Sequence, residues 1–168
     1  PRVEAHLPAG ADPVHAVESV RGIRRRELFR IAAGDLLGMS DVLVVGDALS
    51  ELASATIDTT LEIARRTSEA AEVPEIAVIG MGRWGGRELS YASDADVMFV
   101  HQPHPGSAEK DVQTRATLVV QELRRLLSGS GPDPALGLDP DLRPEGKSGP
   151  LVRSLDAYRT YYERWALT

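Results

Sequence analysis

Apolar residues recur every three or four positions through two long stretches of the first third of the chain. This period predicts one helix from Val17 to Leu37, closed by Gly38, and a second helix from Asp47 to Arg66. Residues 1–16 are rich in Pro, Gly and Ala without any period, so we expect a linker or a frayed end there. The predicted apolar stripes are Val20, Ile23, Leu28, Ile31, Ala32 and Leu36 in the first helix and Leu49, Leu52, Ala53, Thr56, Ile57, Thr60, Leu61 and Ala64 in the second.

Two short apolar runs in the middle of the chain have the length and the β-branched content of strands. The first runs from Glu75 to Gly80 and is typical of a buried strand, and the second runs from Asp94 to His101. Side chains alternate between the faces of a strand, so Asp94, Asp96 and Met98 are expected on one face of the second strand. Two carboxylates would therefore share that face.

The last third of the chain mixes helical period with loop composition. Pro140 weakens its predicted strand because proline cannot donate to a sheet, and Ser154 is a good N-cap for its last helix. Pattern alone thus predicts an α/β or α+β domain. In chain order we expect a helix at Glu109 to Leu127, a loop at Ser128 to Gly137, a short strand at Leu138 to Leu142, a loop at Arg143 to Pro150 and a helix at Leu155 to Leu167.

Composition narrows the classes of protein to consider. The chain has 168 residues, 42% of them hydrophobic and 26% charged, which suits one folded domain. A formal net charge of -6 argues against nucleic-acid binding through a broad basic surface, and no apolar run is long enough to predict a membrane span. The lack of cysteine excludes disulfides and thiolate chemistry and favours the cytoplasm. A start at Pro1 is expected of a piece of a longer chain.

A glycine-rich segment, Gly80 to Gly86, follows the first predicted strand directly. Glycines there would let backbone N–H groups approach a phosphate chain, although a tight turn without a ligand is the alternative. A dinucleotide fingerprint fits poorly because the segment is not expected to open a helix with an acidic residue about 20 positions further on. A Walker loop is excluded because its Gly-Lys-Ser/Thr is missing.

Asp94 and Asp96 are the strongest candidates for chemistry. On one face of a strand they would lie roughly 6.5–7 Å apart, so both carboxylates could converge on one or two Mg²⁺ ions. Two-metal phosphoryl transfer needs a third carboxylate, for which Asp139 and Asp141 both qualify; a solvated loop carboxylate is the alternative for each. Flanking cations could offset the charge of a triphosphate or of leaving pyrophosphate, namely Arg83, Arg87, Arg143, Lys147 and Arg153.

The first predicted helix carries a dense basic cluster, Arg21, Arg24, Arg25, Arg26 and Arg30. The cluster either binds an anionic partner or forms a solvated helix face, and composition does not decide between the two.

Two segments resemble the glutamine synthetase adenylyltransferase family. Residues 80–99, GMGRWGGRELSYASDADVMF, are similar to that family's pattern G-x-G-[K/R]-x-G-G-x-E-L-x-[Y/F]-x-S-D-x-D. Residues 138–152, LDPDLRPEGKSGPLV, resemble its second block, V-D-x-R-L-R-P-x-G-x-x-G-x-L-V, and residues 25–38 look like the segment ahead of its catalytic core. The resemblance covers about Val17 to Thr168.

The resemblance implies a fold and a site. The fold would be α+β, a polymerase-β-like nucleotidyltransferase with a small mixed sheet backed by helices and preceded by helices, over residues 17–168 and truncated at its C-terminal end. Asp94, Asp96 and Asp139 would be catalytic and would ligate Mg²⁺, with ATP as substrate. Asp141 stands where many relatives have Arg, so no role is transferred to it. The residues expected to bind the nucleotide are Gly82, Arg83, Gly85, Gly86, Ser93 and Arg143.

The resemblance also implies an activity. AMP would pass from ATP to a tyrosine hydroxyl of glutamine synthetase and so regulate nitrogen assimilation. Other domains of the full-length enzyme would be partners, and a PII-type signal protein would act through regions absent here. The sequence of residues 83–99 looks more like the C-terminal, adenylylating domain of that enzyme. The adenylyl-removing domain, which releases ADP with phosphate, is the alternative; a non-catalytic nucleotide-binding module is a further one, against which three aspartates argue.

Overall fold

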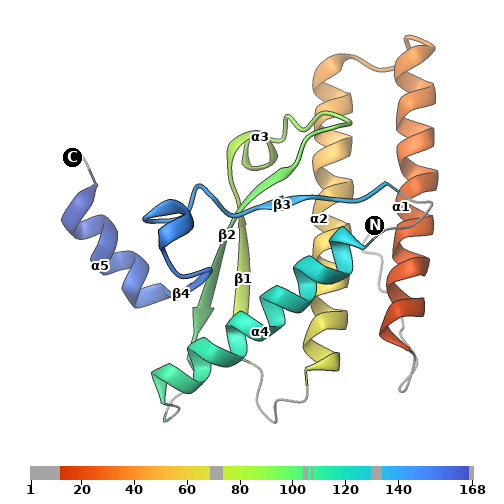
Figure 1. Cartoon of the computed structure of the whole chain (residues 1–168). Helices are drawn as coiled ribbons and strands as arrows, with labels where there is room; N and C mark the ends of the chain where they lie inside the picture. Colours follow the sequence, from red (N-terminus) through yellow and green to blue (C-terminus); the bar gives the residue numbers. More distant parts are fainter. Residues whose placement is uncertain (1–11, 69–73, 104–105, 107, 130–133, 167–168) are drawn as a thin grey trace.

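The computed structural model describes residues 12–68, 74–103, 106, 108–129 and 134–166. In this part of the chain two long helices precede a four-stranded mixed sheet that is backed by further helices (Figure 1). The expected α+β class is thereby confirmed. The elements are α1 (Pro13–Leu36), α2 (Val42–Thr67), β1 (Glu75–Gly80), α3 (Gly82–Gly85), β2 (Ala95–Gln102), α4 (Glu109–Ser128), β3 (Leu138–Asp139), the 3-10 helix η1 (Gly146–Ser148), β4 (Val152–Ser154) and α5 (Leu155–Trp165).

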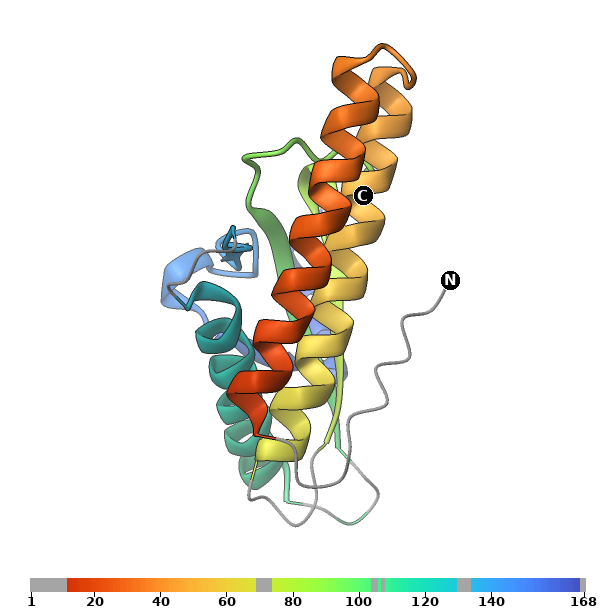
Figure 2. The ribbon, with the colours of Figure 1, turned by 90° about the vertical axis from the view of Figure 1, so that its right-hand side faces the viewer.

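Helices α1 and α2 form an antiparallel hairpin beside the sheet, and its closed end projects beyond the sheet (Figure 2). The predicted start of α1 at Val17 is wrong: the helix begins at Pro13, because the Asp12 carboxylate accepts from Val14 N and proline suits the first turn. The rest of the predicted linker, residues 1–11, lies outside the described residues. Helix α2 begins at Val42, five residues before the predicted Asp47, because the Asp41 carboxylate caps it.

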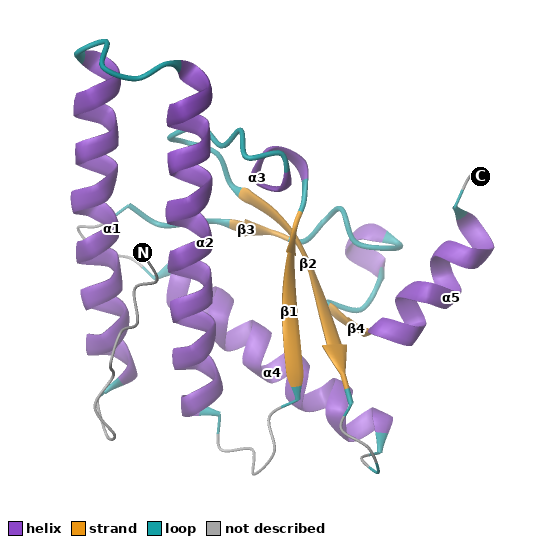
Figure 3. Ribbon diagram, turned by 180° about the vertical axis from the view of Figure 1, so that it is seen from behind, coloured by secondary structure: helices purple, strands orange, loops and turns teal. Residues whose placement is uncertain are grey.

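Strand β2 is the centre of the sheet (Figure 3). Strand β1 pairs antiparallel with it, and Gly80 lies opposite Val97. Along the other edge β3 pairs parallel at Asp96–Asp139, and then β4 pairs parallel at Phe99–Val152. Because β3 and β4 occupy one edge in succession, residues 140–151 leave the sheet between them.

The two faces of β2 serve different purposes. On one face Ala95, Val97 and Phe99 are fully buried in the core, and His101 Nε2 lies 2.8 Å from Gln113 Oε1 of α4. On the opposite face lie Asp96 and Met98, and the Tyr162 hydroxyl of α5 contacts Met98 Sδ at 3.8 Å. Alternation therefore separates a core face from a face that carries the carboxylates.

The C-terminal third follows the prediction in part. The Ser154 hydroxyl accepts from Ala157 N at 3.2 Å and starts α5 as expected. The helix ends at Trp165, so the predicted end at Leu167 is wrong: the chain is already extended at Ala166, which caps α5. The predicted strand Leu138–Leu142 shrinks to two residues because Pro140 cannot donate, and β4 was not predicted at all. No helix in the described ranges is both long and apolar enough to cross a membrane.

Candidate functional site

The predicted carboxylates lie where β2 and β3 begin. Asp96 on β2 is the register partner of Asp139 on β3, and paired residues of parallel strands point to the same face. Asp94 immediately precedes β2, and its Oδ1 lies against Gly137, which immediately precedes β3. The three aspartates, which are 45 residues apart at most in the chain, therefore come together at adjacent positions of the sheet.

Two glycines make room for these carboxylates. A Cβ added at Gly82 would lie 2.2 Å from Asp96 Oδ2, and one added at Gly137 would lie 2.1 Å from Asp94 Oδ1. Gly82 also has φ +50°, a conformation that other residues rarely adopt. A side chain at either position would therefore require the neighbouring carboxylate to move, and at Gly82 it would also strain the backbone.

The donor set fits Mg²⁺ in chemistry, since three carboxylates share one region of the sheet and magnesium prefers oxygen ligands. The oxygens themselves point different ways: Asp96 turns towards Gly82, Asp94 towards Gly137, and Asp139 Oδ1 accepts from Asp141 N at 2.9 Å. Within the described residues no three His, Cys, Asp or Glu side chains gather closely enough to hold a metal ion. The backbone therefore aligns the candidate ligands, and rotation of their side chains is needed for them to converge.

The glycine-rich segment forms one helical turn, α3, instead of an irregular loop. Gly85 N donates to Met81 O at 2.8 Å, and Gly86 N donates to Gly82 O at 3.0 Å. These two N–H groups, expected to bind phosphate, are thus engaged within the turn. The N–H groups of Gly82 and Arg83 come first in the turn and have no acceptor within it.

Arg83 and Ser93, both predicted to bind the nucleotide, differ in whether they are already engaged in contacts within the domain. Arg83 is exposed on α3 and makes no ion pair within the part of the chain that the structure describes. The Ser93 hydroxyl lies 2.6 Å from the Ser90 hydroxyl, so it closes a local turn before Asp94. Arg83 is therefore the more available of the two for an anionic ligand.

Arg143 is largely buried and bridges the two ends of the loop that connects β3 to β4. Its guanidinium donates to Pro140 O at 2.8 Å and to Gly149 O at 3.2 Å. Asp141, which the sequence left as an alternative to Asp139, lies 3.5 Å from Arg143 and 3.2 Å from Lys147. Arg143 thus fixes the turn around Asp141, and its predicted contact with a nucleotide stays a prediction.

A family model described as glutamate-ammonia ligase adenylyltransferase matches residues 2–168. The chain belongs to this family.

Curated members of the glutamate-ammonia ligase adenylyltransferase family include close relatives of the chain. This chain is 50% identical over 170 residues to a bifunctional glutamine synthetase adenylyltransferase/adenylyl-removing enzyme of Streptomyces coelicolor. The match covers 93% of this chain and 17% of that protein. Its identity to the protein of the same description from Cutibacterium acnes is 50% over 157 residues, covering 94% of this chain and 15% of the relative. The chain thus spans 15–17% of the length of these relatives.

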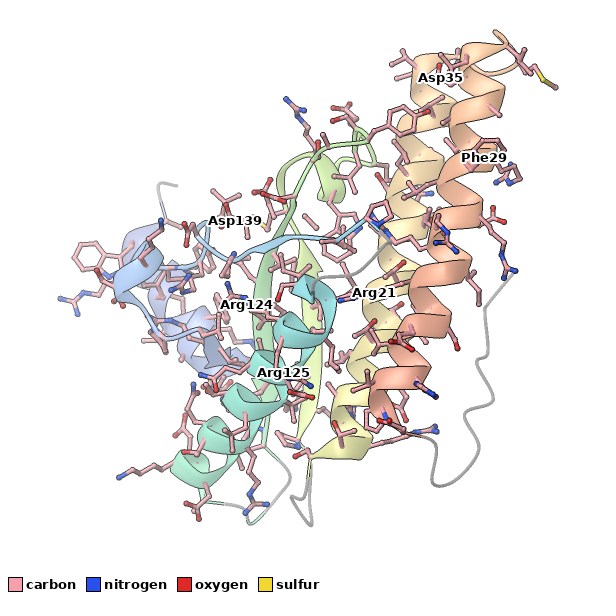
Figure 4. The ribbon with its side chains drawn as sticks, turned by 45° about the vertical axis from the view of Figure 1, so that its right-hand side comes forward. Arg21, Phe29, Asp35, Arg124, Arg125 and Asp139 are labelled. Carbon is pink, nitrogen blue, oxygen red and sulfur yellow. The ribbon has the colours of Figure 1, made fainter. Side chains whose placement is uncertain are left out.

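The structure places two members of the basic cluster in structural roles. Arg21 on α1 donates to Leu126 O in the last turn of α4 (Figure 4), and Arg24 donates to Pro134 O at 2.7 Å. Arginine near a helix C-terminus satisfies carbonyls that lack helical partners. Burial lowers the pKa of Arg24. These two residues therefore do not form a fully solvated helix face, and binding of an anionic partner by the cluster stays a prediction.

Sequence reasoning missed the contacts between α2 and the segment before β2. Arg87, expected near a triphosphate, instead pairs with Asp47 and with Glu51, the latter at 2.7 Å. The hydrogen bond from Arg87 lowers the pKa of Asp47, and the same bond raises the pKa of Arg87. No local pattern signals a pair 40 residues apart, whereas Gly137, directly before a strand with an aspartate, could have been suspected.

Proposed function

We propose that this domain transfers AMP from ATP to a tyrosine hydroxyl of glutamine synthetase. The proposal rests on the register that sets Asp96 opposite Asp139, in a chain of the glutamate-ammonia ligase adenylyltransferase family. Family membership supports a nucleotide substrate. The aligned carboxylates supply the acidic groups that nucleotidyl transfer uses, and the exposed Arg83 supplies a cation beside them.

The aspartates and Arg83 would divide the tasks of the proposed reaction. Mg²⁺ would be held by Asp94, Asp96 and Asp139 and, when bound, would lower the pKa of the attacking hydroxyl. Asp139 keeps Oδ2 free of the bond that Oδ1 accepts from Asp141 N, so Oδ2 would take the hydroxyl proton. Arg83 would offset the charge that develops on the departing pyrophosphate.

The adenylyl-removing reaction is the second candidate. The curated relatives carry both activities in their names, and a single nucleotidyltransferase site could serve either one. In that reaction phosphate would attack the phosphorus of the tyrosine-linked AMP, the bond to the tyrosine oxygen would break, and ADP and the free tyrosine hydroxyl would be the products. The residues at the site are the same in both reactions, so only the products distinguish them.

The test supplies the complete polypeptide that contains this sequence with Mg²⁺ and ATP labelled at the α-phosphate. Label that moves to a tyrosine of unmodified glutamine synthetase, with one pyrophosphate released per AMP, supports adenylylation. A second arm supplies adenylylated glutamine synthetase and phosphate, and ADP as product there supports removal. To assign either reaction to this site, each arm is repeated with Asp96→Asn, which should abolish the reaction of this domain and spare one catalysed elsewhere in the polypeptide.

A further inference from the structure

The segment that joins α3 to β2 lies against one stripe of helix α2. Residues 86–94 contain neither helix nor strand, yet they connect the glycine turn to the first two aspartates. Five residues of α2 at helical spacing form the stripe that meets this region: Gly46, Asp47, Ser50, Glu51 and Ser54. Positions separated by three, four, seven and eight residues share a helix face, so the stripe is one continuous surface.

The contacts between this region and the hairpin run from Trp84 to Tyr91. At one end Trp84 Nε1 of α3 donates to Ser54 Oγ at 3.1 Å, and in the middle Leu89 N donates to Ser50 Oγ at 3.3 Å. The Arg87 guanidinium reaches Asp47 and Glu51. A Cβ on Gly46 would lie 3.2 Å from Glu88 Cα, so backbone meets backbone there. Helix α1 adds a contact at Asp35, which accepts from the Tyr91 hydroxyl at 3.0 Å.

Arg87 holds a backbone conformation that needs support. Its φ of 61° lies in the left-handed region, which is unfavourable for a residue with a Cβ. Such conformations persist when the surroundings fix them, and here two carboxylates of α2 fix the guanidinium. The turn at Arg87 redirects the chain from α3 towards Leu89 and then Asp94.

We propose that the helical hairpin is part of the catalytic apparatus, and that Arg87 is a positioning residue which holds residues 87–93, and through them Asp94 and the glycine turn, against α2. This inference rests on the proposed function. The reaction depends on placing carboxylates and phosphate to within a fraction of an ångström, so a loosened segment lowers the rate of chemistry more than it lowers the affinity for ATP.

The kinetic test uses the complete polypeptide and two variants, Arg87→Met and the double variant Asp47→Asn with Glu51→Gln. Each should lower kcat about 10-fold or more while KM for ATP changes less than about threefold. Combining all three substitutions should be no worse than either variant alone, because both remove the same contact. A raised KM in Arg87→Met, together with normal kinetics when both carboxylates are removed, would mean that Arg87 binds the nucleotide directly and would overturn the proposal.

Arg66→Met is the matched control. Arg66 lies on α2, is as exposed as Arg87, and pairs with Glu62 at 2.8 Å, but it is far along the helix from the stripe. It should leave kcat, KM and the melting temperature unchanged. The Arg87 variants should likewise melt close to the parent temperature, since exposed ion pairs contribute little to stability.

Amide hydrogen exchange tests the contact without any activity. Exchange of residues 88–93 should be faster in both Arg87 and Asp47/Glu51 variants than in the parent and unchanged in Arg66→Met. Unaltered exchange in the Arg87 variant would overturn the positioning role even if the protein is active. If the parent protein transfers no AMP, but exchange of residues 88–93 is still faster in the variants than in the parent, the proposed function is refuted and the contact is not.

Discussion

Gly82 is the residue at which backbone shape and side-chain space impose the same requirement. Its φ of +50° and the 2.2 Å between an added Cβ and Asp96 Oδ2 both disfavour alanine. Gly82→Ala should cost about 1 kcal/mol or more of the free energy of unfolding and lower the proposed activity about 10-fold or more, because the added Cβ strains the backbone and occupies space beside Asp96.

Denaturant unfolding and initial rates measure both effects. Gly34→Ala is the control, since a Cβ there meets only Ser40 Oγ at an ordinary 3.7 Å. Equal behaviour of the two variants would contradict the close approach at Gly82.

Asp58 on α2 provides a test of pH dependence. Partial desolvation on α2 raises the pKa of Asp58 above its ordinary 3.8 although the residue is exposed, so the folded state holds the proton only slightly more tightly than the unfolded state does. Stability attributable to this group therefore rises as pH falls through the raised pKa. Asp58→Asn should raise the melting temperature at pH 7, and the gain should vanish near pH 3; a gain of the same size at both pH values would contradict the burial effect.

At the residue scale the sequence predicted that the aspartates lie near one another, but not which groups surround them. Alternation placed Asp94 and Asp96 on one face, and the register brings Asp139 to the position beside them. Spacing could not separate Asp139 from Asp141, but the structure gives them different surroundings. Asp139 is the register partner of Asp96, whereas Asp141 lies beyond Pro140, which follows β3, and pairs with Lys147.

In helix α2, the stability of the helix and its contact with a neighbouring segment favour different residues at position 46. Gly46 lies inside the helix, where alanine would ordinarily gain about 0.5–1 kcal/mol. Here the new Cβ would press on Glu88 Cα at 3.2 Å and Arg87 O at 3.3 Å, and both residues are exposed and can shift.

Gly46→Ala should therefore leave the melting temperature unchanged or slightly raised and yet lower kcat about 10-fold. Gly22→Ala in α1, where a Cβ meets nothing within 4 Å, should stabilise the protein and leave kcat alone. A Gly46→Ala protein with parental kcat would contradict the role given to the stripe.

At the element scale long periodic segments were predictable and short ones were not. Strand β1 begins and ends as predicted, and α4 differs by one residue at its end. The α1 start depended on Asp12 and Pro13, which stand in a segment whose composition favours a linker. Strand β4 has three residues and exists through its pairing with β2, so no local signal marks it.

The molecule as a whole distributes its apolar residues unevenly. The fully buried Phe99 and Ile57 lie in one core between α2, α4 and the sheet. Leu36, on the predicted buried stripe of the first helix, is instead 88% exposed, because the closed end of the hairpin projects past the sheet (Figure 2). A helical stripe predicts which face is apolar but not how far the partner surface extends.

The two phenylalanines of the chain make this contrast measurable. Phe99→Ala should cost about 3–5 kcal/mol of the free energy of unfolding, since it opens a cavity in the core. Phe29→Ala removes the same atoms from a side chain that is 76% exposed and should change stability by less than about 0.5 kcal/mol. Chemical denaturation of both variants measures these changes in the free energy of unfolding. Similar losses in the two variants would contradict the placement of Phe99 in the core and of Phe29 outside it.

The central claim is that the carboxylates at the start of β2 and β3 carry nucleotidyl transfer. The most direct measurement is the initial rate of AMP transfer from labelled ATP to glutamine synthetase by Asp96→Asn, Asp139→Asn and Asp141→Asn. The first two should lose about 10³-fold or more, and Asp141→Asn should stay within about threefold of the parent, because Asp141 faces Lys147 and Arg143. Near-parental transfer by Asp96→Asn or Asp139→Asn would contradict the account.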